Sequence, residues 1–313
     1  MKKIKLFTHT DLDGVGCAIV AMKVLGRECV DVEYVNYDDV DKKILKWLDE
    51  RDEDVYNNQC FITDISVSEE TARVLNNTDL DLCLLDHHAT AVGLNKYDWC
   101  EVRSIDRFGV PTSGTDMLYE YFLAPADESL RQFVKAVRDY DTWQWVKTPD
   151  GEFSKSLNDL FKIYGRDRFI RKALLALSFN SFRRDFITEP DAEILQLEQE
   201  KIDRMVAEKN KEIRVASLFG YKAGAVFAEE HISELGNKLC CLNPELDFIA
   251  VVNMTTKTVS FRTVKDIDMG KDIASKFGGG GHPKAAGATI SDNTENMLLA
   301  TLFGEMTREK MDE

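Results

Sequence analysis

Short apolar runs alternate with amphipathic segments from Lys3 to about residue 122. The runs are "KIKLF", "VDVEYVNY", "QCFITDIS" and "LDLCLL", and the segments between them include "GVGCAIVAMKVLG", "VDKKILKWLDE" and "SEETARVLNN". Apolar runs this short indicate buried strands, whereas the longer segments have the periodicity of helices. Strands that alternate with helices predict βαβ units and a mostly parallel sheet.

Helical patterns dominate the middle of the chain, from Glu128 to about residue 182. The stretch "EPDAEILQLEQEKIDRMVAEKNKEIRVAS" that follows is long, charged and periodic, which predicts a connecting helix; an interaction coiled coil is the weaker interpretation. After about Arg214 the composition changes, and "FIAVVNMTTKTVSFRT" predicts a hairpin around "TTKT".

These patterns predict an α/β protein with two folded units. A chain of 313 residues is long enough to bury two cores. We expect a larger domain with a mostly parallel sheet over residues 1–185, a helical connector over 186–213 and a smaller α/β domain over 214–313.

Composition narrows the class of protein. With 44% hydrophobic and 30% charged residues, the chain has no stretch near the roughly 20 apolar residues of a membrane helix, and its first apolar run is too short for a signal peptide. We therefore expect a cytoplasmic protein. The seven cysteines have no C-x-x-C spacing, which favours neither a disulfide framework nor a zinc site. The net charge of −15 argues against coating of long nucleic acid, although carboxylates that hold divalent metal would present positive charge to a small phosphate-bearing substrate.

Three predicted strands end in acidic residues and histidines, within "HTDLD", "TDIS" and "LDHH". The residues concerned are His9, Asp11, Asp13, Asp64, Asp86, His87 and His88. Ligands of open α/β sheets gather at the carboxyl ends of strands, so these side chains can converge although they lie far apart in sequence. Each aspartate alone could instead cap a helix and the histidines could form a solvated turn, but all motifs together favour one site.

Carboxylates and imidazoles without thiolates form a ligand set suited to Mn²⁺ or Mg²⁺ rather than to structural zinc. If Asp64 bridges, two metal ions a few ångströms apart become feasible. Such a pair activates a water molecule while it neutralises phosphate charge.

The ordered motifs "HTDLDG", "FITDIS" and "LDHH" resemble the first three motifs of the DHH phosphoesterase superfamily, and "AVRDYDTW" resembles the fourth. The stretch "GGGGHPKAAG", Gly278 to Gly287, is similar to the signature of the DHH-associated substrate-binding domain. Within the superfamily, "HTDLDGVGCA" and "DYDTW" look most like the bacterial oligoribonuclease B type, which degrades very short RNA. The resemblance implies a DHH-type catalytic domain, two divalent metal ions, with Mn²⁺ first and Mg²⁺ or Co²⁺ as alternatives, and it is compatible with a homodimer.

The resemblance also implies roles for individual residues. One metal ion would be held by His9, Asp11 and Asp64, and the second by Asp13, Asp64, His87 and one of Asp139 and Asp141. We favour Asp139 because it lies where the helix of the fourth motif is expected to end. His88 would reach the scissile phosphate, and Asp86 would orient the histidine pair from behind.

Substrate contacts are expected in both domains. In the second, Gly279, Gly280 and Gly281 with His282 and Lys284 would cradle phosphate oxygens; the alternative for the glycine run is a flexible loop. The segment from Lys257 to Lys284 has six basic residues and three acidic ones. The basic residues are Lys257, Arg262, Lys265, Lys271, Lys276 and Lys284, and the acidic ones are Asp266, Asp268 and Asp272.

Four further residues have two interpretations each. Phe261 or Phe277 could stack on a base, with core burial as the commoner fate. Arg103 and Ser113 follow the histidine pair and could contact substrate, but a surface arginine and a helix N-cap serine fit equally well.

The predicted function is a metal-dependent phosphodiesterase that hydrolyses very short RNA to mononucleotides. The alternatives are hydrolysis of 3′-phosphoadenosine 5′-phosphate or of a linear or cyclic dinucleotide. A nucleotide-binding regulatory module is the non-enzymatic alternative.

Overall fold

The computed structural model describes residues 3–52, 55–122 and 127–290. The chain forms two compact units, Met1–Leu195 and Gln196–Glu313. The boundary lies inside helix α9 (Glu189–Lys211), in the region where we expected a connector. Leu195 in this helix packs against the core of the first unit, whereas Ile202 and Val206 are buried in a core of the second. Among the described residues, no helix combines the length and the apolar character needed to span a bilayer.

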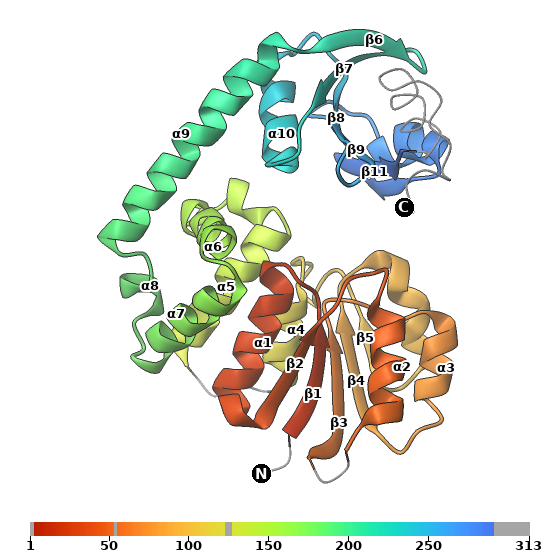
Figure 1. The fold of residues 1–313 in the computed structure, drawn as a ribbon, viewed down its shortest axis with the longest axis vertical. Helices are drawn as coiled ribbons and strands as arrows, with labels where there is room; N and C mark the ends of the chain where they lie inside the picture. The colour runs from red at the N-terminus through yellow and green to blue at the C-terminus, as the bar shows by residue number, and fades with distance from the viewer. Residues whose placement is uncertain (1–2, 53–54, 123–126, 291–313) are drawn as a thin grey trace, which may run out of the picture. The chain divides into compact units, whose positions relative to one another are not determined.

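The first unit is built on a five-stranded sheet with the order β2-β1-β3-β4-β5, and every pair of neighbours is parallel (Figure 1). Its strands are β1 (Lys3–Thr8), β2 (Val30–Tyr34), β3 (Tyr56–Thr63), β4 (Asp81–Asp86) and β5 (Cys100–Val102). The α/β class with a parallel sheet is thus confirmed. The first connection runs from β1 out to β2 and the second returns past β1 to β3, so the winding direction reverses between β1 and β3.

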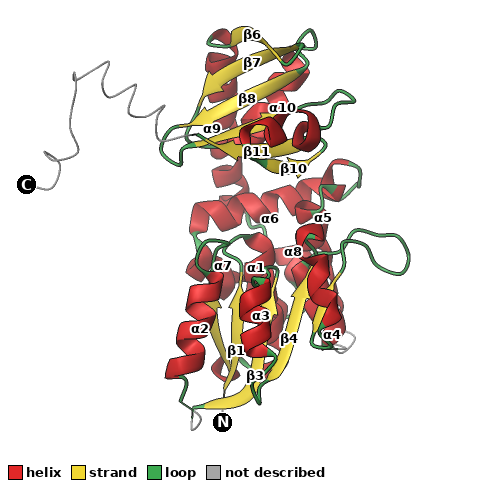
Figure 2. Cartoon of the chain, turned by 90° about the vertical axis from the view of Figure 1, so that its right-hand side faces the viewer, coloured by secondary structure: helices red, strands yellow, loops and turns green. Residues whose placement is uncertain are grey.

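Helices cover both faces of this sheet (Figures 1 and 2). On one face lie α1 (Leu12–Leu25), α4 (Gly114–Tyr121) and α5 (Glu128–Asp141), and on the other lie α2 (Val40–Glu50) and α3 (Glu69–Leu75). Successive strand residues alternate between the two cores, since Leu6 and Phe61 pack on the α1 side whereas Phe7 and Ile62 pack on the α2 side. The sheet is therefore buried on both faces, which explains the continuous apolar runs in the sequence.

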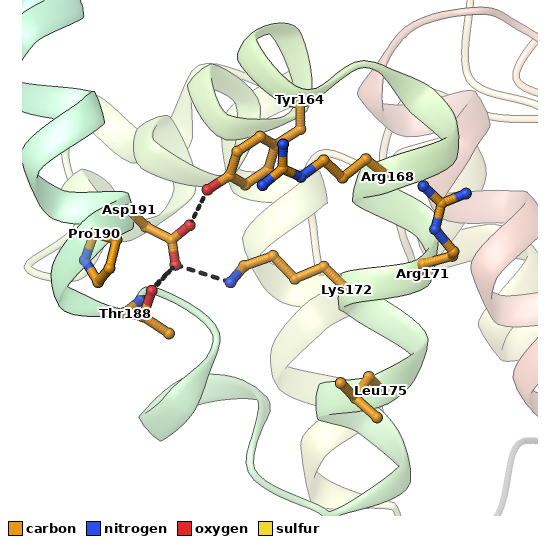
Figure 3. A pocket seen from close by; sticks show the side chains of 8 residues that line it. All are labelled: Tyr164, Arg168, Arg171, Lys172, Leu175, Thr188, Pro190 and Asp191. Atoms are coloured by element: carbon orange, nitrogen blue, oxygen red, sulfur yellow. Dashed lines mark hydrogen bonds and ion pairs between the residues drawn. The ribbon is translucent and has the colours of Figure 1, made fainter.

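Helices α6 (Gly151–Tyr164), α7 (Arg166–Ser178) and α8 (Phe182–Asp185) extend the first core. A hollow of about 680 Å³ lies between α6, α7 and the start of α9 (Figure 3). Inside it, Asp191 pairs with Lys172 at 2.8 Å and accepts hydrogen bonds from Tyr164 and Thr188. Burial raises the pKa of Asp191, but these partners outweigh it and lower the pKa to about 2. The Asp191 carboxylate is thus satisfied, and its contacts tie three helices together.

The second unit contains a six-stranded mixed sheet with the order β10-β11-β9-β8-β7-β6. Its strands are β6 (Arg214–Leu218), β7 (Tyr221–Phe227), β8 (Phe248–Asn253), β9 (Thr258–Arg262), β10 (Gly280–His282) and β11 (Ala285–Thr289). Among the strands within the described residues, only the β7–β8 pair is parallel, and the predicted hairpin is the antiparallel β8–β9 pair. Helix α10 (Ile232–Leu242) packs on one face of this sheet (Figure 2).

Candidate active site

The acidic motifs of the first unit meet at the carboxyl edge of the parallel sheet. His9 directly follows β1, Asp64 follows β3, and His87 follows β4. Since β1, β3 and β4 are adjacent, these residues lie beside the point where the winding reverses, which is where open α/β sheets bind ligands. The fourth motif reaches the same edge from α5, whose last residue is Asp141.

Two helix starts hold the carboxylates of the first motif. Asp11 is the N-cap of α1 and accepts a hydrogen bond from the Gly14 amide at 3.0 Å. The buried Asp13 carboxylate accepts hydrogen bonds from the amides of Gly114 at 2.6 Å and Thr115 at 3.0 Å, at the start of α4. Amides at helix N-termini stabilise negative charge, so the backbone holds both carboxylates in place.

Asp64 is fixed in an unusual backbone conformation. Its φ is +57°, in the left-handed region that non-glycine residues rarely adopt, and its amide donates to the Leu85 carbonyl at 2.9 Å. A Cβ on Gly114 would lie 2.5 Å from the Asp64 Cβ, so only glycine lets the start of α4 approach this closely. The strained residue is thus held from both sides, as is common at functional sites.

The Asp64 carboxylate faces two groups of polar atoms. In the first group, His9 Nδ1 lies 3.0 Å from Asp11 Oδ2 and 3.9 Å from Asp64 Oδ2. In the second, His87 Nε2 lies 3.2 Å from Asp64 Oδ1, 3.5 Å from Asp141 Oδ2 and 3.8 Å from Asp13 Oδ2. One oxygen of Asp64 therefore belongs to each group.

Both groups have the chemistry of cation sites. The ligand atoms of His9, Asp11 and Asp64, and those of Asp13, His87 and Asp141, lie within 4.8 Å of one another in each set. Four of the atoms are buried without a hydrogen-bond partner, namely His9 Nδ1, Asp64 Oδ2, His87 Nε2 and Asp141 Oδ2. Buried polar atoms normally have partners, and imidazole nitrogens with carboxylate oxygens suit Mn²⁺ or Mg²⁺. The residues present therefore fit divalent cations.

Electrostatics supports the same conclusion. Burial, with the nearby charges of Asp13 and Asp11, raises the pKa of Asp64 and that of Asp141 well above the ordinary carboxyl value. Burial alone also raises the pKa of Asp11, but its close contact with the His9 imidazole and its hydrogen bond from the Gly14 amide lower it to about 2. Burial lowers the pKa of His87 and keeps that imidazole neutral, as a metal ligand must be. Cations would relieve the repulsion among the carboxylates.

The structure corrects our preference between the two aspartates of the fourth motif. Asp141 lies beside His87, whereas the buried Asp139 forms ion pairs with Lys135 and with Arg138. Two residues along a helix differ by about 200° in direction, so only one of the pair can face the strand ends. Asp141, which we had placed second, is the one in the cluster.

Asp86 and His88 form a chain of hydrogen bonds behind the cluster. Asp86 Oδ1 lies 2.7 Å from His88 Nδ1 and accepts from the His87 amide at 2.8 Å, while Ser66 donates to Oδ2 at 2.5 Å. Burial lowers the pKa of His88, but the hydrogen bond to Asp86 and the negative charges of Asp86, Asp13 and Asp11 together outweigh it, so the net pKa is raised. Asp86 thus lies where an orienting group for His88 is expected.

Sequence reasoning missed Tyr37, which lies in the same place. Its hydroxyl is 3.1 Å from His88 Nε2, and its ring centroid is 5.2 Å from that of His9. The only signal in the sequence is its position at the end of the run "VDVEYVNY", on the edge where the other motifs gather.

The two expected substrate contacts of the first unit have structural partners. Arg103 forms ion pairs with Glu101 at 2.8 Å and with Glu120. Ser113 is buried and caps α4 by accepting a hydrogen bond from the Asp116 amide at 3.2 Å. Neither side chain belongs to the groups of metal-ligand type.

The second half of the glycine run lies in a strand rather than in a loop. Gly280–His282 pairs with β11 as the exposed strand β10. A Cβ on Gly279 would lie 2.0 Å from the Gly287 carbonyl oxygen, and one on Gly281 would lie 2.6 Å from the Ala286 Cα. These glycines are therefore required by the packing of their own hairpin, whatever ligand it binds.

The other expected contacts of the second unit differ in accessibility. Arg262 donates to Ser233 at 2.9 Å, and Lys284 donates to a backbone carbonyl, that of Lys265. Phe261 is buried in the core, and its ring stacks on Phe277, which is 46% exposed. Of the two phenylalanines, only Phe277 remains accessible to a base.

Carboxylates and histidines at adjacent strand ends give this fold a site whose chemistry suits hydrolysis of phosphate esters with divalent cations. Comparison with known proteins agrees. A family model described as the DHHA1 domain matches residues 243–307. Oligoribonuclease NrnB of Bacillus subtilis (strain 168) is 37% identical over 306 residues, which span 95% of this chain and 75% of NrnB.

Two solved structures share the fold. Exonuclease RecJ bound to manganese matches with a TM-score of 0.55 and 13% identity, over 96% of this chain and 88% of RecJ. The pGpG-specific phosphodiesterase PggH from Vibrio cholerae matches with a TM-score of 0.51 and 15% identity, over 96% and 97% of the two chains. The chain belongs to the DHH phosphoesterase family and is a phosphoric diester hydrolase of the oligoribonuclease type.

Proposed function

We propose that this enzyme is a metal-dependent exoribonuclease that degrades very short RNA oligonucleotides to mononucleotides. The observation that carries the proposal is the Asp64 carboxylate, whose two oxygens face two groups of buried ligand atoms. The choice of substrate is supported by the identity to NrnB, which is named an oligoribonuclease.

The proposed ligand sets follow the two groups. His9, Asp11 and Asp64 would hold one cation, and Asp13, Asp64, His87 and Asp141 would hold the other. Asp13 can bind a cation while it accepts its two amide hydrogen bonds, because a carboxylate offers about four lone-pair sites. Two Mn²⁺ or Mg²⁺ ions bound there would supply water activation and would neutralise phosphate charge.

The remaining side chains would position the phosphodiester. His88 lies at the edge of the ligand groups, with its Nδ1 held by Asp86, so its Nε2 side is directed away from Asp86. We assign it to contact with the scissile phosphate. Asp86 fixes the orientation of His88, and Ser66 fixes Asp86, as supporting residues of metal centres commonly do.

The second unit has its own candidate groups for phosphate binding. The exposed strand Gly280–His282 offers backbone atoms and an imidazole, and Lys284 lies two residues further on. We assign these groups to the phosphates and the accessible ring of Phe277 to a base.

The test is hydrolysis of 5′-labelled RNA from two to about twenty-four nucleotides, with Mn²⁺ and with a chelator. The proposal predicts rapid, metal-dependent loss of the shortest RNAs and poor cleavage of the longest. Parallel reactions contain pGpG, a cyclic dinucleotide and 3′-phosphoadenosine 5′-phosphate. Turnover of pGpG or of the cyclic dinucleotide alone would contradict the proposed substrate but not the phosphodiesterase chemistry. Turnover of 3′-phosphoadenosine 5′-phosphate alone would contradict both, because its phosphates are monoesters.

A further inference from the structure

Tyr37 lies on the segment between β2 and α2, and this segment is held against the first motif. The Val35 amide donates to the Thr8 carbonyl at 2.9 Å, and Thr10 Oγ1 donates to Asn36 Oδ1 at 2.9 Å. The Asn36 amide in turn donates to Asp39 Oδ1 at 2.7 Å. The residues on both sides of Tyr37 are thus fixed, which fixes the position from which its side chain extends.

One edge of the Tyr37 side chain faces the site, and the rest of the side chain is exposed to solvent. Its ring centroid lies 5.2 Å from that of His9 and 5.9 Å from that of His88. Its hydroxyl lies 3.1 Å from His88 Nε2, yet the residue is 60% exposed. A side chain with this exposure contributes little to the core, so packing alone does not explain its position.

The hydrogen bonds of His88 define what the hydroxyl can do. Nδ1 of His88 is committed to Asp86, and the single hydrogen-bonding site of Nε2 faces the Tyr37 oxygen. When Nε2 donates to that oxygen, the hydroxyl hydrogen remains available for the substrate. A phenol ionises only near pH 10, so Tyr37 is a neutral donor at ordinary pH. The four carboxylates that line the site repel an anionic phosphodiester. Binding therefore needs hydrogen-bond donors beside these carboxylates.

We propose that Tyr37 is a substrate-binding residue of this active site, whose hydroxyl, oriented by His88, donates a hydrogen bond to a non-bridging oxygen of the phosphodiester. The inference rests on the proposed role of His88 beside the scissile phosphate. It does not depend on RNA as the substrate, because linear and cyclic dinucleotides contain the same phosphodiester group.

The experiment compares the wild type with Tyr37→Phe and with the control Tyr121→Phe, which removes a hydroxyl from another half-exposed tyrosine on α4. Substrates are a dinucleotide RNA and bis(p-nitrophenyl) phosphate. A hydrogen bond to a charged group corresponds to a factor of about 10 to 100, so kcat/KM of Tyr37→Phe is expected to fall at least about tenfold on both. Tyr121→Phe keeps the wild-type value, and neither change lowers the melting temperature.

Binding gives a readout that is independent of turnover. Adenosine 5′-monophosphate is expected to bind Tyr37→Phe about tenfold more weakly than wild type by calorimetry, whereas the affinity for adenosine, which lacks the phosphate, is unchanged. In a His88→Gln background the effect of Tyr37→Phe shrinks, because the hydroxyl has already lost the group that orients it.

The inference would be overturned if Tyr37→Phe kept the wild-type kcat/KM on both substrates, or if it lost as much affinity for adenosine as for adenosine 5′-monophosphate. It would also be overturned if the loss of kcat/KM in the double variant equalled the product of the losses in the two single variants. Failure of the proposed function is distinguishable from these. If wild-type enzyme cleaves bis(p-nitrophenyl) phosphate but not short RNA, the RNA assignment is wrong and the test of Tyr37 proceeds on the first substrate.

Discussion

The strand-end cluster of the first unit and the glycine hairpin of the second differ in how their polar groups are satisfied. In the cluster, the ligand atoms of His9, Asp64 and His87 are buried and lack hydrogen-bond partners. In the hairpin, His282 is exposed and Lys284 already donates to a carbonyl. The cluster is therefore preorganised for cations, whereas the hairpin is a surface that would exchange its present contacts for those of a ligand.

Glycine has a related role in both regions. Gly114 lets the start of α4 approach Asp64, so the glycine serves the site directly. Gly279 and Gly281 let β10 approach its partner strand, so these glycines serve the hairpin first. A glycine motif can thus mark a binding region while its immediate physical cause is local packing.

The largest expected effect is that of Asp64→Asn, which removes the charge shared by both ligand groups. Loss of groups that merely support metal ligands costs about 10- to 100-fold, so loss of the shared ligand should reduce hydrolysis more than about 100-fold. Initial rates with Mn²⁺ measure this. Without cations the variant should be at least as stable as wild type, because a buried, repelled carboxylate is gone. Wild-type activity, or an unchanged rise of melting temperature with Mn²⁺, would refute the bridging role.

The next effect separates the two aspartates of α5. Asp141→Asn should reduce activity about 10- to 100-fold at limiting Mn²⁺, because the second ligand group loses a carboxylate. The matched change Asp139→Asn should leave activity within about threefold. It should lower stability by about 1 kcal/mol, because the partner Lys135 is half exposed and its ion pair is screened. The reverse pattern would restore Asp139 as the ligand.

The hairpin should show a moderate effect on binding alone. Removal of both His282 and Lys284 by alanine substitution should raise KM for a dinucleotide about tenfold with little change in kcat, because charged hydrogen bonds to phosphate are lost. Lys271→Ala, at a basic residue of the same unit that pairs only weakly with Asp268 at 3.7 Å, is the control. An equal effect of the control would show that general charge, rather than the hairpin, attracts the substrate.

The smallest effect concerns pH. The raised pKa of Asp64 and of Asp141 means that, with chelator, these groups stabilise the fold fully only below their unfolded pKa of about 4. That stability is lost as pH rises through the raised values. Asp11, whose pKa is lowered to about 2, has the opposite effect on the pH dependence of stability. It stabilises the fold above about pH 4, and this stabilisation is lost as the pH falls from about 4 towards 2.

Melting temperatures of wild type and Asp64→Asn in chelator, measured above pH 5, test the direction of this pH dependence of stability. The wild type should lose more stability with rising pH than the variant, since the variant lacks one of the two groups. Parallel curves would show that Asp64 takes up no proton on folding.

Much of the first unit followed from local sequence. Apolar runs separated by amphipathic segments predicted the parallel sheet, and the acidic ends of three strands predicted one site, because parallel strands end on the same edge. The hairpin of β8 and β9 was equally clear from its alternation. The conversion of the glycine run into a strand was not, since a run without side chains has no apolar pattern to indicate which strand it pairs with.

The sequence by itself determined the order of strands and helices and the ligand chemistry at the strand ends, because these depend on side-chain type and periodicity over a few residues. Tertiary structure alone decided that Asp141 rather than Asp139 joins His87, because the choice depends on how α5 is rotated against the sheet. It also decided that Tyr37 meets His88, 51 positions away in the chain, because that contact needs β2 and β4 to belong to one sheet.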